Sequence, residues 1–187
     1  MKHVPNILSI LRILAAPVII AVYFFSGTNA RLTVAIIYIA ASATDMLDGL
    51  IARRFNAISN LGRILDPLGD KLLMLAVMGC LAADRRLPVW AFVLLFLKEG
   101  FMILGSAFVH GKFKYEMPPS VFAGKAATFV LFIIGMSFLI FDIPRPITDY
   151  MAAVAVGVAF LAFGGYLTVY RNLSKKHQQE IQQENQQ

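Results

Sequence analysis

Long apolar stretches separated by short polar breaks dominate the chain. Each stretch comes close to the roughly 20 helical residues that cross a hydrocarbon core about 30 Å thick. Turn-forming and charged residues, such as Ser26-Gly27-Thr28-Asn29 and Asp84-Arg85-Arg86, fall between the stretches. The pattern predicts an all-α integral membrane protein with six transmembrane helices, over residues 7–26, 32–54, 66–83, 88–110, 121–141 and 147–170.

Basic residues are shared unequally between the two sides of this predicted bundle. One set of breaks and ends holds Lys2, Arg53, Arg54, Arg63, Lys112, Lys114, Arg171, Lys175 and Lys176, and the other holds Arg31, Arg85, Arg86 and Arg145. Because lysine and arginine favour the cytoplasmic side, both termini are predicted to be cytoplasmic. We interpret residues 1–187 as a single membrane domain. Its polar tail, 171–187, is expected in the cytoplasm as a fraying helical extension or as a disordered segment.

Composition supports a lipid environment. The chain is 58% hydrophobic and 15% charged, whereas a soluble domain is about half apolar and about a quarter charged. The net charge of +6 lies in short interhelical loops, which fits anionic lipid better than nucleic acid. The first apolar stretch is longer than the core of a signal peptide and is expected to be retained. Cys80 is the only cysteine, so an internal disulfide is excluded.

Four aspartates carry the candidate chemistry. Asp45 and Asp48 are three residues apart near the end of the second span, and Asp66 and Asp70 are four apart at the start of the third, so each pair shares a helix face. The short connection makes the two helices antiparallel neighbours, and we expect the four carboxylates to converge at the cytoplasmic side. The cost of ionised groups in a bilayer favours a functional role.

Hard divalent cations suit such an all-oxygen set, with Mg²⁺ or Mn²⁺ preferred. Structural alternatives exist for single residues: Asp66 precedes Pro67 and fits a helix N-cap, and Asp45 or Asp48 could pair with Arg53. Small residues at 49, 52 and 62 leave room beside the carboxylates for a nucleotide, although close helix packing would explain them equally well.

The arrangement Asp45-x-x-Asp48-Gly49-x-x-Ala52-Arg53, followed by eight residues and Gly62-x-x-x-Asp66-x-x-x-Asp70, resembles the complete signature of the CDP-alcohol phosphatidyltransferases. The resemblance extends over nearly the whole chain in length and number of spans. It implies a membrane transferase of phospholipid biosynthesis that moves a phosphatidyl group from CDP-diacylglycerol onto an alcohol and releases CMP.

The resemblance also implies site residues. Asp45, Asp48, Asp66 and Asp70 would hold one or two divalent metal ions, and Asp70 would also be the catalytic base. The CDP pocket would be formed by Asp45, Gly49, Ala52, Arg53, Gly62 and Asp66. The family further suggests a homodimer in the cytoplasmic (inner) membrane, with the active site facing the cytoplasm.

The acceptor is predicted from weaker motifs. Pro5-Asn6 with Arg12, Lys98-Glu99, and Gly124-Lys125 with Thr128 resemble the branch of the family that makes phosphatidylglycerophosphate from glycerol 3-phosphate. Lys98 stands where that branch has arginine. Candidates for binding an acceptor phosphate are Lys98, Lys125 and Arg63. Taken alone, Arg12 would be a snorkelling arginine and Lys98 the partner of a nearby carboxylate such as Glu99 of a packed neighbour.

Alternatives remain for the function. Cardiolipin synthases of the same family share these motifs and would use phosphatidylglycerol as acceptor, and inositol phosphate is another family acceptor. From a different class, a divalent cation transporter would also cluster aspartates in a membrane. Transporters tend to have inverted repeats and broken helices near the midplane, and neither is evident here. A catalytically inactive scaffold is disfavoured by the complete carboxylate set.

Overall fold

The computed structural model describes residues 4–54, 62–113 and 122–184. Within these ranges the chain forms six α-helices and one short 3₁₀ turn, and no strand. The elements are α1 (Val4–Phe25), η1 (Gly27–Asn29), α2 (Ala30–Arg54), α3 (Gly62–Ala83), α4 (Val89–Phe113), α5 (Phe122–Ile140) and α6 (Arg145–Glu184). The predicted all-α architecture is therefore confirmed. The last helix runs on to Glu184, so the polar tail begins as a helical extension.

Two of the helix connections show why the helices end where they do. Gly27 has a φ of 71°, a left-handed conformation open to glycine, and it starts the turn between α1 and α2. After α3, the Arg85 N–H bonds to the Ala82 carbonyl at 3.1 Å and the Arg86 N–H to the Leu81 carbonyl at 2.8 Å. This is a Schellman cap, and Arg85 occupies its left-handed position with a φ of 56°. A non-glycine residue there costs roughly 1–2 kcal/mol.

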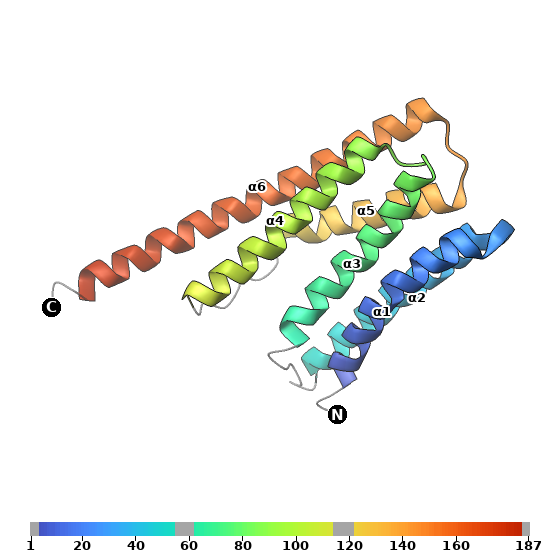
Figure 1. Cartoon of the computed structure of the whole chain (residues 1–187). Helices are drawn as coiled ribbons and strands as arrows, with labels where there is room; N and C mark the ends of the chain where they lie inside the picture. The colour runs from blue at the N-terminus through green and yellow to red at the C-terminus, as the bar shows by residue number, and fades with distance from the viewer. Residues whose placement is uncertain (1–3, 55–61, 114–121, 185–187) are drawn as a thin grey trace.

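The helix arrangement differs from the predicted one in one respect. Helix α1 packs along both α2 and α3, while α2 and α3 contact each other only over a short length. On the other side, α6 packs against α5 and α4. The bundle thus has two halves joined through contacts of α3 and α2 with α4 and α5 (Figure 1). Among the described residues, α1 therefore contacts each of the two acidic helices more extensively than they contact each other.

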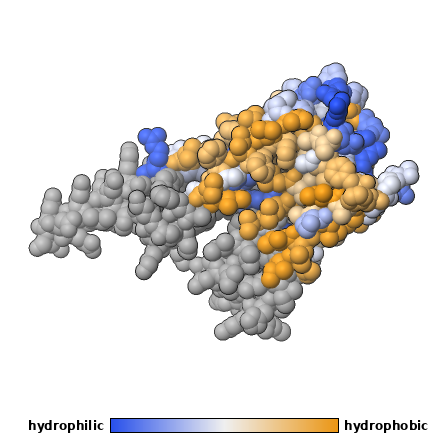
Figure 2. Space-filling model, viewed as in Figure 1, coloured by the Kyte–Doolittle hydropathy of each residue, from blue (hydrophilic) through white to orange (hydrophobic). Residues whose placement is uncertain are grey.

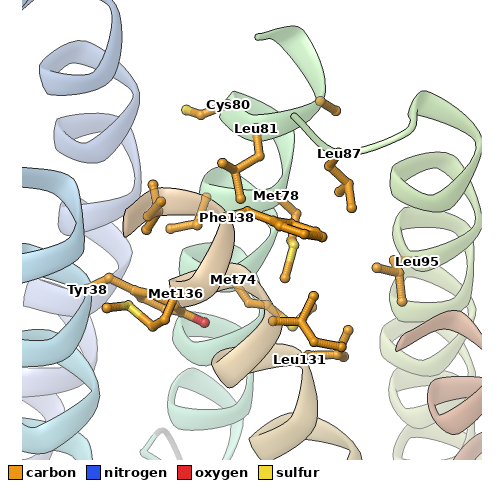
Figure 3. Packing of buried hydrophobic residues seen from close by; sticks show 14 of the residues in the cluster. Tyr38, Met74, Met78, Cys80, Leu81, Leu87, Leu95, Leu131, Met136 and Phe138 are labelled. Atoms are coloured by element: carbon orange, nitrogen blue, oxygen red, sulfur yellow. The ribbon is translucent and has the colours of Figure 1, made fainter. Parts of the chain in front are cut away.

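A single apolar cluster fills the centre of the bundle. Phe138 and Leu131 of α5 lie among Met78 and Leu81 of α3 and Leu95 of α4 (Figure 3). The inner face of α6 consists of small side chains that are almost fully buried, namely Ala152, Ala155, Ala159 and Ala162. The alanines allow α6 to lie close to its neighbours, because a small side chain shortens the distance between helix axes.

The outer surface of the bundle is apolar. Large hydrophobic side chains such as Phe25, Phe101, Leu104, Phe129 and Leu161 are exposed, and hydrophobic residues cover much of the described surface on the face shown in Figure 2. Such an area in water would be an association or aggregation site, whereas hydrocarbon solvates it well. Within the described residues, one helical stretch, 145–168, is long and apolar enough to cross a membrane, and two shorter apolar helices cover 10–25 and 124–140.

Hydrophilic residues gather at one end, where the α3–α4 and α5–α6 connections lie (Figure 2). Arg86 joins the two connections: its Nε lies 2.9 Å from Asp84 Oδ2, and its Nη2 contacts Asp142 Oδ1. Arg31 of α2 also pairs with Asp142, with Nη1 2.9 Å from Oδ1, and the Tyr23 hydroxyl donates to Asp84 at 2.9 Å. This ionic network links α1 and α2 to the α3–α4 and α5–α6 connections.

We expect Asp142→Asn to lower the melting temperature slightly at neutral pH. Hydrogen bonds from Arg86 and then Arg31 lower the pKa of Asp142, so its stabilising contribution is complete above the unfolded pKa of about 3.9 and is lost as the pH falls through the lowered folded value. The difference between wild type and variant should therefore shrink in strong acid. Thermal unfolding in an uncharged detergent, at pH values from 7 to 2, measures the difference in melting temperature. A difference that stays constant over this range would contradict a stabilising role of the Asp142 carboxylate.

Candidate functional site

The end of the bundle opposite the ionic network carries the predicted carboxylates. The last turns of α2 and the first turns of α3 lie at this end together with the start of α1 (Figure 1). Positions 45 and 48 belong to the helical backbone of α2, and 66 and 70 to that of α3. The side chains and surroundings of eight predicted positions lie outside the described residues, namely Asp45, Asp48, Gly49, Ala52, Arg53, Gly62, Arg63 and Asp66.

Asp70 is the predicted site residue whose surroundings are clearest. Its side chain is 44% exposed, and its Oδ1 lies 3.4 Å from Nη1 of Arg12, whose side chain is 3% exposed. Arg12 comes from α1, so the pair depends on the packing of α1 against α3. The interpretation of Arg12 as a snorkelling residue is wrong, because its guanidinium is buried beside Asp70. The buried guanidinium therefore restrains the orientation of the Asp70 carboxylate.

The residue after Asp70 enters a second, buried charge group. Lys71 of α3 and Lys98 of α4 both contact the carboxylate of Glu99: Lys98 Nζ lies 2.6 Å from Oε1, and Lys71 Nζ contacts Oε2. The Lys98 and Glu99 side chains are 7% and 5% exposed. The ion pair with Glu99, which was the structural alternative for Lys98, is present, but it forms within one helix rather than between packed neighbours. Two cations share one anion, so the group carries a net charge of +1.

Helices α5 and α6 close the group from the other side. A side chain added at Gly124 would place its Cβ 2.7 Å from the Tyr166 hydroxyl, so glycine is required for this close approach. Tyr166 lies on α6 and is half-buried. Lys125, the next residue on α5, is exposed, and Thr128 bonds back to the Gly124 carbonyl at 3.1 Å. Lys98 is therefore joined to the charge group near Asp70, and Lys125 is not.

Sequence reasoning missed the roles of Arg12, Lys71 and Tyr166. Arg12 belongs to the Pro5-Asn6 motif, but a single sequence does not show that its side chain contacts Asp70. For Lys71, the position directly after Asp70 is the one signal that the sequence offers. For Tyr166 there was no signal beyond its place in an apolar helix.

The donor chemistry of the four aspartates fits a hard divalent cation. Carboxylate oxygens are the ligands that Mg²⁺ and Mn²⁺ accept, and Asp70 remains partly exposed while its other side faces Arg12. Among the side chains that the structure describes, no group of three His, Cys, Asp or Glu residues could hold a metal ion. Three of the four aspartates lie outside that set.

An apolar helical bundle with ionisable groups buried near one end is typical of proteins that act within a membrane. Comparison with known proteins identifies the family: residues 2–166 match the family model described as CDP-alcohol phosphatidyltransferase. The match covers most of the chain, and the chain belongs to this family.

Curated relatives agree with the family model. The chain is 32% identical over 173 residues to the CDP-diacylglycerol–glycerol-3-phosphate 3-phosphatidyltransferase of Rickettsia bellii, covering 92% of this chain and 93% of that protein. The protein of the same name from Rickettsia felis gives the same identity and coverage. The cardiolipin synthase (CMP-forming) of Streptomyces coelicolor is 35% identical over 133 residues, covering 68% of this chain and 60% of that protein.

Proposed function

We propose that the protein transfers the phosphatidyl group of CDP-diacylglycerol to glycerol 3-phosphate, forming phosphatidylglycerophosphate and CMP. The observation that carries the acceptor assignment is the Lys71–Glu99–Lys98 group, in which Lys98 and Glu99 are buried and Lys71 directly follows Asp70 on α3. An acceptor with a hydroxyl and a phosphate needs a base and a cationic contact a few ångströms apart. Names of relatives that match along nearly the whole chain support the same acceptor.

In this proposal the four aspartates, Asp45, Asp48, Asp66 and Asp70, hold one or two Mg²⁺ or Mn²⁺ ions. When bound, such an ion neutralises the pyrophosphate charge and stabilises CMP as a leaving group. Asp45, Gly49, Ala52, Arg53, Gly62 and Asp66 form the CDP pocket, in which glycine and alanine leave space for the nucleotide. Arg53 contributes a planar and permanently charged contact to phosphate.

Asp70 acts as the general base. It accepts the proton of the acceptor hydroxyl, whose oxygen forms a bond to the lipid-side phosphorus. The bond from that phosphorus to the bridging oxygen breaks, and the oxygen leaves with CMP. Arg12 positions Asp70 from the side away from the substrate, since the guanidinium is buried and the carboxylate is partly exposed.

The lysine group binds the acceptor phosphate. Glu99 compensates one of the two ammonium charges of Lys71 and Lys98, and the remaining positive charge attracts a phosphate that carries up to two negative charges. Glu99 also fixes both side chains before substrate arrives, which reduces the entropy lost on binding. Arg63 is a further candidate at this end of α3, and the exposed Lys125 is the weakest of the three predicted residues.

The remaining parts of the proposal concern the membrane. We infer six transmembrane spans with both termini in the cytoplasm, from the excess of lysine and arginine in one set of loops. The site then faces the cytoplasm in the inner membrane, where CMP is released, and the tail 171–187 is cytoplasmic. The whole chain forms a single membrane domain, and the family suggests a homodimer.

An acceptor screen tests the proposed function. Purified protein in neutral detergent, with CDP-diacylglycerol and Mg²⁺, is incubated with glycerol 3-phosphate, phosphatidylglycerol, inositol phosphate or serine, and the release of CMP and the lipid product are measured. We expect product with glycerol 3-phosphate. Cardiolipin formed from phosphatidylglycerol would assign the alternative activity, that of a cardiolipin synthase. If none of the acceptors tested supported CMP release, the acceptor assignment would be overturned. Cation flux in liposomes without CMP release would favour a transporter.

Removing divalent ions is expected to abolish the transfer. Excess chelator takes away the charge compensation that the pyrophosphate needs, and activity should return when Mg²⁺ or Mn²⁺ is added in excess. The measurement is the initial rate of CMP release with chelator alone and after metal is restored. Ca²⁺ at the same concentration serves as a control for the preference for smaller ions. Full activity in chelator would contradict a metal role for the aspartates.

We expect Lys98→Ala to raise the KM for glycerol 3-phosphate by about tenfold or more, the effect of losing one charged hydrogen bond, with little change in the KM for CDP-diacylglycerol. Lys125→Ala is the comparison, because that side chain is exposed, and a smaller effect is expected. Steady-state kinetics with each substrate varied in turn measure both constants. Equal increases for the two substrates in Lys98→Ala would contradict a role in acceptor binding.

A further inference from the structure

A pocket lies at the end of the bundle that is far from Asp70. It has a volume of about 260 Å³, and the α3–α4 connection, the end of α5 and the start of α6 enclose it. Asp70 and Arg85 are separated by 15 residues of α3 and its cap, which corresponds to about 22 Å along a helix. The lining residues are Arg85, Arg86, Phe138, Phe141, Asp142, Ile143, Pro144, Arg145 and Thr148.

Positive charge is in excess in this pocket. Three arginines and one aspartate line it, and the charge of Asp142 is already shared between Arg86 and Arg31. Arg85 and Arg145 are exposed, and neither forms an ion pair with any other residue that the structure describes. Two guanidinium groups at the pocket are therefore available to an anion, and each offers a planar set of donors that matches phosphate.

The backbone at Arg85 is an independent sign that its side chain is used. Among the described residues, Arg85 is the one non-glycine residue with a positive φ, 56°. It occupies the capping position of α3 where glycine would be unstrained. Strained positions cluster at binding sites, where the side chain is needed in spite of the backbone. Here the strained residue presents a guanidinium to the pocket.

The rest of the lining indicates what the anion is attached to. Phe138, Phe141, Ile143 and Pro144 are apolar, and Thr148 uses its hydroxyl for the carbonyls of Ile143 and Pro144, both at 3.2 Å. A fully hydrated free anion gains little from apolar walls. The phosphate of a lipid headgroup has glycerol carbons and acyl chains beside it, and at this end the polar patch directly adjoins the apolar sides of the bundle (Figure 2).

We propose that this pocket binds the phosphate group of an anionic phospholipid in the leaflet opposite the candidate active site, with Arg85 and Arg145 as its main contacts. Arg86 belongs to the structural network with Asp84 and Asp142 and contributes charge to the pocket. The site differs from the substrate site in position and in residues, so it does not depend on the proposed activity.

Binding is tested by calorimetric titration in neutral detergent containing EDTA, which removes the divalent ions that a substrate site would use. The ligands are dihexanoyl phosphatidylglycerol, dihexanoyl phosphatidylcholine and inorganic phosphate. The variants are Arg85→Gly, which removes the guanidinium and eases the backbone, and Arg145→Gln. Arg171→Gln is the matched control, because Arg171 is an exposed arginine of the same helix as Arg145, about 39 Å further along it.

We expect phosphatidylglycerol to bind to the wild-type protein and to Arg171→Gln, and at least about tenfold more weakly to Arg85→Gly and to Arg145→Gln. Binding of inorganic phosphate with the same dependence on the two arginines would show that the phosphate group alone is sufficient for binding. If inorganic phosphate does not bind while phosphatidylglycerol does, the site is specific for the lipid. Equal affinity for phosphatidylcholine, or affinities unchanged in both arginine variants, would overturn the proposal.

Discussion

Asp70→Asn is expected to lower kcat for phosphatidyl transfer by about 10²–10⁴-fold, the contribution typical of a positioned general base. Asparagine has almost the same shape but cannot take the proton of the acceptor hydroxyl. Binding of CDP-diacylglycerol should persist, because the proposed CDP pocket does not include Asp70. The measurement is the initial rate of CMP release at saturating substrates with Mg²⁺, together with the KM for CDP-diacylglycerol. Unchanged kcat would remove Asp70 from the role of base.

A structural explanation for the same loss can be separated from a chemical one. Asp70 also forms an ion pair with the buried Arg12, so its removal takes one carboxylate away from a buried cation. In the double variant Arg12→Gln with Asp70→Asn, both charges are gone and folding should recover. If activity recovers as well, the loss in Asp70→Asn was structural. Asp70→Glu, which retains a carboxylate, is expected to keep part of the activity, and Asp149→Asn, an exposed site on α6, should behave as wild type.

Glu99→Ala is expected to destabilise the protein by about 3–5 kcal/mol, because it leaves a buried charge without its compensating partner. In the variant, Lys71 and Lys98 lie close to each other and the carboxylate that they share in the wild type is missing. For a chain of this length the cost corresponds to a fall in melting temperature of about 6–20 °C. Thermal unfolding in detergent, followed by the fluorescence of the single tryptophan, Trp90, measures this change.

Glu99→Gln serves as the matched variant for Glu99→Ala. Glutamine retains the volume and one oxygen acceptor but removes the negative charge, so we expect an intermediate melting temperature. Lys98→Ala combined with Glu99→Ala removes one charge of each sign and should recover part of the loss. A melting temperature within one or two degrees of wild type for Glu99→Ala would show that water or lipid already compensates the two lysines, and the pre-organised acceptor site would have to be abandoned.

The sequence predicted the helices well because apolar stretches and their breaks are local features. The predicted spans and the observed helices begin and end within about four residues of each other, with the exception of the end of α6. That helix continues to Glu184, because its Gln-, Lys- and Glu-rich tail has good helix propensity while lacking the hydrophobicity from which the span was predicted.

Pairwise contacts between distant helices could not be predicted in the same way. The short connection after Arg54 suggested that α2 and α3 are close partners, but α1 packs along both. The partner of Arg12 depends on this packing. The motif Lys98-Glu99 places a lysine and a glutamate on α4, whereas the contact of Glu99 with Lys71 depends on the packing of α3 against α4. The convergence of Asp45, Asp48 and Asp66 stays a prediction, since their side chains lie outside the described residues.

The position of α1 has a consequence for how the protein is made. In the proposed topology α1 enters the membrane first, and an arginine within a span costs up to about 2.5–3.5 kcal/mol on insertion scales, the value at the helix centre. The contact between Arg12 and Asp70 can form only once the third helix has been synthesised. Early intermediates therefore carry this cost, and assembly of the first three helices releases it. Correct insertion of the nascent chain is thereby coupled to completion of the acidic end of the bundle.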